Sequence, residues 1–337
     1  MSRRFTLAVV LPILLAAGVA SAHAWKTAAA SEPALPLHLI GDFPLTGNAT
    51  RFDYVSMDRA QRTLWLAHMG DGSVEAFDVK DNRVRLTVPL TPTASVRGIL
   101  SAHGKVYAAA QGLGSVVVLK GESGERLASV PAGDVNGLAY DPVTRRVFVS
   151  DQRGGRDVVI DGRTNAGVGS VILNGEAGNT QYDTASRHIF VGVQDHDELG
   201  EIDPSALKVV RRYALPGCRL SHSVMIDSGA RAAYVGCKGN LRIVRLDLRT
   251  GRVTASGDVG AGVDVLALDP GLHRLYVASE SGVVSVYDVG DGRLQRLGQA
   301  FLALNAHVVG VDSATHRVYF PLQDVGGKPI MRVMEPR

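Results

Sequence analysis

The sequence predicts an all-β fold, a seven-bladed β-propeller, from three observations: a repeat, a strand pattern and an unfinished last repeat. A β-rich element centred on an aromatic residue recurs about every 43 residues, a period typical of repeat architectures. Each repeat divides into four short strands with turns about every 8 to 12 residues, which leaves little room for helices. Seven such sheets cover their faces and protect their edges when they stack radially around a channel. The seven aromatic residues are Trp65, Tyr107, Phe148, Phe190, Tyr234, Tyr276 and Tyr319.

Residues 1–24 have the three-part pattern of a secretory signal peptide. Two arginines precede an apolar run from Leu7 to Ala20, and small residues follow it. The run is too short to cross a bilayer core, which needs about 20 helical residues. We therefore expect cleavage after Ala22 or Ala24 and an exported protein, periplasmic or secreted, with no transmembrane segment. Residues 25–36, rich in Ala, Ser and Pro, are predicted to be a linker.

The composition is that of an ordinary globular protein and does not favour nucleic acid as a partner. The 337 residues are 45% hydrophobic and 20% charged, with a formal net charge of +3. Two of the arginines belong to the predicted leader, so the mature chain is nearly neutral. Proteins that bind nucleic acid electrostatically carry a concentrated basic face instead. We expect a monomer.

The sixth repeat shows the four strands most clearly. Apolar or alternating segments cover residues 263–268, 274–278, 282–289 and 293–299, and turn residues separate them. The seventh repeat has only three such segments, at residues 306–312, 317–322 and 329–334. The missing strand is expected at residues 37–43, which resemble the fourth strands of other repeats. Pairing of this strand with the C-terminal strand closes the ring and makes residues 37–337 one domain.

An aspartate stands seven residues before six of the seven aromatic residues. An aspartate side chain accepts backbone N–H bonds from residues just beyond it and tolerates turn conformations. We therefore predict a structural role in the first turn of each repeat. The six residues are Asp58, Asp141, Asp183, Asp227, Asp269 and Asp312.

The two cysteines are predicted to form a disulfide, with two buried thiols as the alternative. Cys218 lies just before one predicted strand and Cys237 ends the next, so a hairpin brings them together. Cysteines of exported proteins commonly pair. A bridge closing a loop of about 20 residues stabilises by roughly 3 kcal/mol in the loop-entropy account.

Three segments carry a resemblance to a known family. Residues 141–150 (DPVTRRVFVS), 269–279 (DPGLHRLYVAS) and 241–251 (LRIVRLDLRTG) are similar to the YVTN/YncE-type repeat. The resemblance runs through all seven units and implies a periplasmic or surface seven-bladed propeller. Members of this family bind partners or nucleic acid, and related propellers carry haem or act as lactonases or lyases. Because function lives in a site grafted onto a fold, the resemblance does not select among these.

A polar residue recurs five positions before the first turn of each repeat, in strands that are otherwise apolar. The innermost strand of a propeller blade begins near the axis, so these residues are expected to form a ring at the channel mouth. Histidine and carboxylate ligands suit a divalent metal, and Arg97 suits an anion. A solvated mouth that tolerates any polar residue is the alternative. The first ring comprises Asp53, Arg97, Asn136, Asn179 (or Gly178), His222, Asp264 and His307.

A second ring is predicted four residues after each aromatic residue. The recurrent glutamines have two interpretations: they line the upper channel, or they cap loops through an amide that both donates and accepts. The second ring comprises Met69, Gln111, Gln152, Gln194, Lys238, Glu280 and Gln323.

Three classes of function follow from these rings. The leading prediction is a non-enzymatic exported propeller that binds a small molecule or a protein on the face bearing both rings. The second is a metal-assisted lyase or lactonase-type hydrolase, in which His222, Asp264 and His307 hold the ion and His222 or Glu280 moves a proton. The third is a redox propeller with histidines as axial ligands of a non-covalent macrocycle. The sequence has no C-x-x-C-H, so covalent c-type haem is excluded, and it has no G-x-S-x-G or Gly-Lys-Ser/Thr motif.

Overall fold

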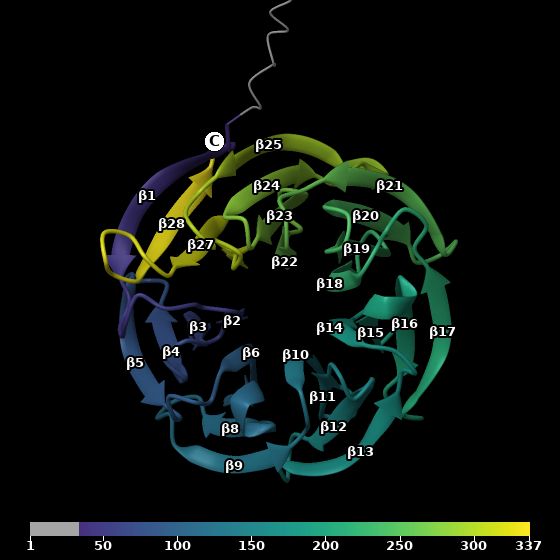
Figure 1. Ribbon diagram of the computed structural model, residues 1–337, viewed down its shortest axis with the longest axis horizontal. Coiled ribbons are helices and arrows are strands. Elements are labelled where there is room, and N and C mark those ends of the chain that lie inside the picture. The colour runs from purple at the N-terminus through teal and green to yellow at the C-terminus, as the bar shows by residue number, and fades with distance from the viewer. Residues whose placement is uncertain (1–33) are drawn as a thin grey trace, which may run out of the picture. The chain divides into compact units, whose positions relative to one another are not determined.

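The computed structural model describes residues 34–337, which form seven four-stranded sheets around a central axis (Figure 1). This is the predicted seven-bladed β-propeller. The predicted signal peptide and most of the predicted linker lie outside the described residues. Within residues 34–337, no helix has the length and apolar character that spanning a bilayer would require.

Blades one to six each consist of four consecutive antiparallel strands, numbered outward from the axis. Blades one and two contain β2 (Val55–Asp58), β3 (Thr63–His68), β4 (Ser73–Asp78), β5 (Arg83–Pro89), β6 (Val96–Ala102), β7 (Lys105–Ala110), β8 (Ser115–Lys120) and β9 (Arg126–Pro131). Blades three and four contain β10 (Val135–Asp141), β11 (Arg146–Asp151), β12 (Arg156–Asp161), β13 (Ala166–Ile172), β14 (Ala177–Asp183), β15 (His188–Val193), β16 (Glu198–Asp203) and β17 (Lys208–Ala214). Blades five and six contain β18 (Ser221–Asp227), β19 (Ala232–Cys237), β20 (Arg242–Asp247), β21 (Arg252–Asp258), β22 (Val263–Asp269), β23 (Arg274–Ser279), β24 (Val283–Asp288) and β25 (Gln295–Phe301).

Blade seven joins the two ends of the described chain. It contains β26 (Gly310–Asp312), β27 (Arg317–Leu322), β28 (Ile330–Pro336) and, as its outermost strand, β1 (Leu37–Pro44). β1 pairs antiparallel with β28, from Leu37 opposite Pro336 to Pro44 opposite Ile330. The innermost strands contact one another in sequence, and β26 contacts β2, so the ring is closed. The predicted closure by the N-terminal strand is confirmed.

The innermost strand of blade seven is shorter than the sequence pattern predicts. It begins at Gly310, because the backbone before it is bonded elsewhere. The N–H of His307 donates to the carbonyl of Asn305, which has a left-handed φ of 57°, and the carbonyl of His307 accepts from Val265 of blade six. The segment around His307 is therefore attached to the neighbouring blade instead of to β27.

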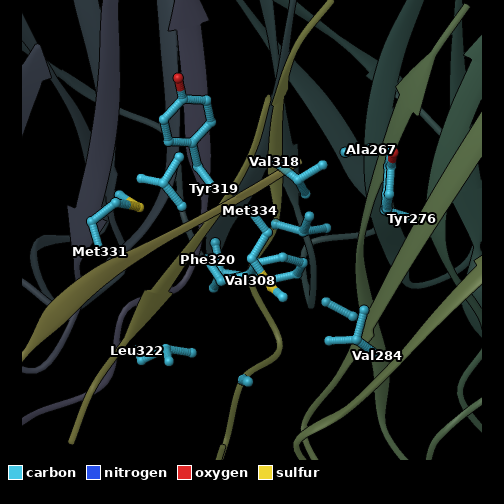
Figure 2. Close-up of a cluster of buried hydrophobic side chains, with 14 of the residues drawn as sticks. Ala267, Tyr276, Val284, Val308, Val318, Tyr319, Phe320, Leu322, Met331 and Met334 are labelled. Carbon is cyan, nitrogen blue, oxygen red and sulfur yellow. The ribbon is translucent and has the colours of Figure 1, made fainter. Parts of the chain in front are cut away.

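The core consists of apolar layers between adjacent blades. All seven repeated aromatic residues are buried, with exposed fractions of 1% or less. Figure 2 shows one such layer, in which Tyr276 and Val284 of blade six lie near Val318, Phe320 and Met334 of blade seven. Because the hydrophobic effect is proportional to the apolar area removed from water, each blade depends on both neighbours for its stability.

The turn aspartates act as the sequence predicts. Asp141 accepts the N–H of Val143 at 2.9 Å and of Thr144 at 3.2 Å, and Asp269 accepts the N–H of Gly271 at 3.0 Å. Equivalent bonds to a following N–H are formed by Asp58, Asp183, Asp227 and Asp312. Their role in the first turn is confirmed.

Cys218 and Cys237 are joined by a disulfide across blade five, with Cα atoms 5.1 Å apart. Backbone bonds join the same two loops, since the N–H of Lys238 donates to Leu220 O and the N–H of Gly239 donates to Arg219 O. The covalent link and the backbone bonds together fix the loops that carry Lys238 at the channel mouth.

Asp157 on β12 is a completely buried carboxyl group. Its partner is the hydroxyl of Thr180 on β14, which donates to Oδ2 at 3.1 Å. Burial raises the pKa of Asp157 to about 7, and the hydrogen bond from Thr180 opposes only part of this effect. Since an unfolded aspartate has a pKa near 3.8, the folded protein holds an extra proton between about pH 4 and pH 7.

We predict that Asp157→Asn removes a pH-dependent loss of stability. The wild-type free energy of unfolding should fall as the pH rises from 4 to 7 and level off above 7, because the unfolded state then holds fewer protons than the native state. At about 1.4 kcal/mol per pKa unit, the variant should gain roughly 4 kcal/mol relative to wild type between pH 4 and pH 8. Urea unfolding at several pH values measures this difference.

Asp161→Asn, on the same strand, is the matched control, because its effect on stability should depend on pH in the opposite direction. Hydrogen bonds from Arg163 and from the N–H of Thr164 lower the pKa of Asp161 to about 2. This variant should lose stability at pH 7, and the loss should disappear as the pH falls below about 2. A flat pH dependence of the difference between Asp157→Asn and wild type would contradict the prediction.

Candidate functional site

The face at which the innermost strands begin contains a polar cavity of about 320 Å³ at the axis, here called the upper cavity. Except for Arg51, every lining residue belongs to one of the two predicted rings. The cavity is lined by Arg51, Asp53, Met69, Arg97, Asn136, Gln152, Gln194, His222, Lys238, Asp264 and Glu280.

Arg51 is the centre of an ion-pair network in this cavity. Its Nη2 lies 3.0 Å from Oδ1 of Asp53 and 3.5 Å from Oδ2 of Asp264. Oε1 of Glu280 is 3.3 Å from the same nitrogen and 3.2 Å from Nζ of Lys238. Burial would lower the pKa of Arg51, but Asp53, Asp264 and Glu280 together raise it. Burial likewise opposes ionisation of Glu280, yet Lys238 and Arg51 keep the pKa of this carboxyl below its usual value.

A buried polar network holds the loop that presents Arg51. The hydroxyl of Thr50 donates to Oδ1 of Asp71 at 2.7 Å and contacts Nε2 of His68 at 2.9 Å. Nδ1 of His68 lies 2.8 Å from Oε1 of Glu75, and both of these side chains are fully buried. Because Thr50 is the neighbour of Arg51 in the chain, this network fixes the guanidinium over the carboxylates.

His307 lies behind the ion pairs with an acceptor at each ring nitrogen. Nδ1 is 2.8 Å from the carbonyl of Asn305 and Nε2 is 3.3 Å from Oδ1 of Asp53. A carbonyl and a carboxylate only accept, so both contacts are hydrogen bonds when the ring carries two protons. Burial favours the neutral ring, but the Asp53 hydrogen bond and the charge of Asp264 outweigh it and raise the pKa of His307.

His222 connects the second ring to Asp264. Its Nδ1 lies 2.8 Å from Oε1 of Gln194, and its Nε2 lies 3.4 Å from Oδ1 of Asp264. Burial would raise the pKa of Asp264, but His222 and His307 hold it well below its usual value, so the carboxylate is ionised. Because both histidines have partners at both ring nitrogens, binding as axial ligands of a macrocycle would break these contacts.

The opposite half of the cavity contains amides and one cation. Nε2 of Gln152 donates to Oε1 of Glu176 at 3.0 Å, so its carbonyl oxygen faces Nδ2 of Asn136, 3.4 Å away. With the amide nitrogen of Asn136 directed at Gln152, the buried Oδ1 of Asn136 has no hydrogen-bond donor within residues 34–337. Arg97 is half-buried beside these amides and forms no ion pair or side-chain hydrogen bond with the described residues, although its charge helps to lower the pKa of Asp134.

Four predicted ring residues lie outside the lining of the upper cavity. Gln111 donates to Oδ1 of Asp134 at 2.8 Å, and Gln323 accepts from Nδ2 of Asn305 at 2.7 Å, so these two glutamines bind loop residues. Both interpretations of the recurrent glutamines therefore occur, since Gln152 and Gln194 line the cavity. His307 is buried behind Asp53, and Asn179 hydrogen-bonds across the axis to the hydroxyl of Tyr54.

The side chains best placed for a metal ion differ from the predicted set. Asp53, Asp264 and His307 offer ligand atoms within 4.8 Å of one another, whereas His222, the predicted third ligand, lies outside this group. Arg51 binds the same oxygens, Asp53 Oδ1 and Asp264 Oδ2, that approach Nε2 of His307. The guanidinium of Arg51 therefore fills the place that a cation would take.

Arg51 and Tyr54 are the residues of the channel that the sequence pattern does not identify. Both lie in the first blade at positions where the other repeats have unrelated residue types. At the position of Arg51, two before the first-ring residue, the later repeats have Ser95, Asp134, Ala177, Leu220, Gly262 and Asn305. A search for recurring positions therefore cannot find Arg51.

No protein-family model matches this chain, and no curated protein sequence matches it. Solved structures match it in fold. "Kuenenia stuttgartiensis Hydrazine Synthase" has a TM-score of 0.71 and 14% identity, covering 88% of this chain and 97% of that chain. "Crystal structure of RRP9 WD40 repeats" has a TM-score of 0.75 and 11% identity, covering 91% and 99%. Likeness at such low identity shows the propeller fold alone.

We predict that Arg51→Ala creates a divalent-metal site. Removing the guanidinium leaves Asp53 and Asp264 uncompensated beside His307, and a mixed histidine and carboxylate set suits Zn²⁺ or Mn²⁺. Isothermal titration with Zn²⁺ should show one ion bound at least ten times more tightly by the variant than by wild type.

Arg51→Lys is the matched control, because it keeps a cation at this position and should bind Zn²⁺ no better than wild type. Equal Zn²⁺ affinity of wild type and Arg51→Ala would show that Arg51 does not occupy the metal position.

Proposed function

We propose that this protein is an exported propeller that binds a small anionic ligand in the upper cavity. The observation that carries the proposal is Arg97, whose guanidinium lines the cavity without an ion-pair partner among the described residues. Arg51 and Lys238, the other cations of the lining, are both bound to carboxylates. A carboxylate that Arg97 influences is Asp134, whose pKa Arg153 and Arg97 both lower, and Asp134 forms its ion pair with Arg153 instead. An anion that enters the cavity therefore meets a guanidinium with no ion pair of its own and a strong bidentate preference.

The side chains next to Arg97 support a ligand that also donates a hydrogen bond. The orphaned Oδ1 of Asn136 is a buried acceptor, and leaving such a group unsatisfied costs about 1 to 3 kcal/mol. A hydroxyl or amine of the ligand would remove this cost. A hydroxycarboxylate or an aminocarboxylate has both groups, and a cavity of about 320 Å³ holds a molecule of that size.

Export to the periplasm or the medium is the second part of the proposal. The leader pattern of residues 1–24 and the Cys218–Cys237 pair support it. Within the propeller fold, the repeat motifs support a place among YVTN/YncE-type proteins.

A metal-assisted hydrolase or lyase is the second candidate, favoured by the close approach of Asp53, Asp264 and His307. It requires the metal to displace Arg51 from the oxygens of Asp53 and Asp264. We rank it below anion binding, because the chain already supplies the compensating cations.

The anion proposal predicts stabilisation by L-malate or inorganic phosphate. A ligand that binds only the native state raises stability by about 2.7 kcal/mol at one hundred times its dissociation constant, which a thermal unfolding scan detects. Arg97→Ala should reduce the affinity at least tenfold. Arg219→Ala, an exposed arginine on the same face outside the cavity, is the matched control and should leave affinity unchanged. Stabilisation that persists in Arg97→Ala would overturn the assignment.

Export predicts a shortened chain without titratable thiols. Protein recovered from the periplasm or medium should begin at His23 or Trp25 on N-terminal sequencing. Denatured but unreduced protein should contain no free thiol, and two after reduction, because Cys218 and Cys237 are the only cysteines. A full-length N-terminus in cytoplasmic protein would contradict the export proposal.

A further inference from the structure

We propose that a cleft between blades five and six, here called the interblade cleft, is a second binding site, which takes a phosphate group. The cleft has a volume of about 560 Å³ and is lined mainly by the turns that follow β18, β20, β22 and β24. The innermost strands β18 and β22 begin at the upper cavity and end at these turns, so the cleft lies on the opposite face of the ring. It shares no lining residue with the upper cavity and is independent of the anion site proposed above.

Arg245 on β20 places a charge at a position that is apolar in five other blades. It is paired with Tyr234, the repeated aromatic residue of blade five. Arg245 lies two residues from Ile243, on the same face of the strand, and Ile243 belongs to the apolar layer between blades five and six (Figure 1). The guanidinium is therefore directed into the space between the two blades. The residues paired with the repeated aromatic residue in the five other blades are Ala76, Val118, Val159, Val286 and Val333.

The guanidinium of Arg245 is buried without a carboxylate partner. The residue is 6% exposed, and it forms no ion pair with the described residues. Nη1 donates to the hydroxyl of Thr254 at 2.8 Å, and the hydroxyl has no net charge to compensate the cation. Burying a charge without a partner of opposite sign is costly, and a bound anion would remove this cost.

Blade four shows how this chain compensates a charge at the same position. Glu201 occupies the place in blade four that Arg245 occupies in blade five. Its carboxylate lies 2.6 Å from Nδ1 of His188 and accepts the hydroxyl of Tyr213 at 2.7 Å. Arg245 has no comparable partner among residues 34–337, so we infer that its compensating charge comes from a ligand.

Open space adjoins the guanidinium of Arg245 in the cleft. A Cβ atom added to Gly292 would lie 3.8 Å from Nη2 of Arg245, an ordinary contact distance, and no closer atom lies outside the turn of Gly292 itself. Gly292 and Arg245 both line the cleft. The structure therefore leaves room for a ligand atom beside Nη2.

Arg249 adds a second cation to the interblade cleft. It is exposed, its Nη1 donates to the carbonyl of Ala230 at 3.3 Å, and it forms no ion pair with the described residues. His273 is also exposed in the lining, and the exposed carboxylate of Asp291 lies 3.6 Å from Arg293. The two arginines of the cleft are therefore available to an anion.

The half-buried carboxylate of Asp227 determines which anion the cleft favours. It accepts the N–H of Ala230 at 2.9 Å and forms no ion pair with the arginines of the cleft. Like charges repel, so an anion beside Asp227 is favoured when it donates a proton. A phosphate group has at least three oxygens that accept from arginine, and near neutral pH it can keep a proton. A carboxylate has two oxygens and no proton at this pH, so the lining favours phosphate.

Calorimetric titration with inorganic phosphate tests the site in Arg97→Ala, because this variant removes the unpaired guanidinium of the upper cavity. The mature protein should bind phosphate, and adding Arg245→Val should weaken binding at least tenfold, because a buried charge pair is lost. Valine occupies this position in four other blades, so the variant should fold, which thermal unfolding without phosphate checks. Unchanged phosphate affinity after Arg245→Val would overturn the proposal.

Arg249→Ala and Arg252→Ala are matched variants of two exposed arginines in blade five, one inside the cleft and one outside it. Arg249→Ala should weaken phosphate binding about threefold, as expected for an exposed ion pair. Arg252→Ala should leave it unchanged. If Arg245→Val does not fold, this pair decides the test, and equal phosphate affinities of the two variants would overturn the site.

Two further ligands identify the group that binds. Tighter binding of glycerol 3-phosphate than of inorganic phosphate would assign the phosphate group to a larger molecule, and the reverse would assign it to the free ion. Either result supports the site if Arg245→Val weakens both ligands. Acetate that binds as tightly as phosphate would overturn the phosphate assignment.

L-Malate separates this inference from the proposed function, because phosphate bound in the cleft would also stabilise Arg97→Ala. Malate binding that is lost in Arg97→Ala and kept in Arg245→Val would support two separate sites. Malate binding lost in Arg245→Val would overturn the separate site. Absence of malate binding, together with phosphate binding that depends on Arg245, would overturn the upper-cavity site alone.

Discussion

The closure of the ring by β1 and β28 is the constraint on which the other features depend. Each blade buries its apolar faces only against its neighbours, so an open ring would expose the faces of two blades and the edge of β28. The register from Leu37 opposite Pro336 to Pro44 opposite Ile330 fixes the position of the loop that follows β1. That loop carries Arg51, and it leads into blade one with Asp53 and Tyr54. The strand pairing that closes the ring therefore also positions residues that line the channel.

Charge compensation explains why the upper cavity has two unlike halves. Burying the carboxylates of Asp53 and Asp264 without partners would be prohibitively costly, and half-buried Glu280 adds a third negative charge beside them. Arg51 and Lys238 compensate them, and Nε2 of His307 approaches Asp53; these partners come from blades one, five and seven. Because the compensation is local to this side of the ring, Arg97 in blade two takes no part in it and interacts only at longer range with Asp134. The same electrostatics that stabilise one half leave the other half able to bind an anion.

Repetition determines how much of this structure the sequence could predict. The fold and the turn aspartates depend on features that recur along the chain, the strand pattern in all seven blades and the aspartate in six, while the ring closure follows from the one repeat that lacks its fourth strand. The upper-cavity lining was also accessible, because a side chain at a fixed strand position meets the axis in each blade. The positions of Arg51 and Tyr54 were not accessible, since each contact crosses from one blade to another and has no counterpart elsewhere in the chain. Gln111 and Gln323 show the converse: the same strand position binds a local loop where Asp134 or Asn305 is within reach.

A hydrogen bond across the channel follows from a departure from that symmetry. Six blades have small or aliphatic residues directly after the first-ring position: Gly98, Gly137, Thr180, Ser223, Val265 and Val308. Blade one alone has an aromatic residue there, and only a side chain of the length of tyrosine can reach from one side of the ring to Asn179 on the other. Its hydroxyl accepts a hydrogen bond from Nδ2 of Asn179, so this one side chain connects blades one and four. The cavity lined by Arg51, Asp53 and Asp264 shares no lining residue with the cavity lined by Tyr54, Ile99 and Leu138. One departure from the repeat pattern thus places a side chain across the channel between blades one and four.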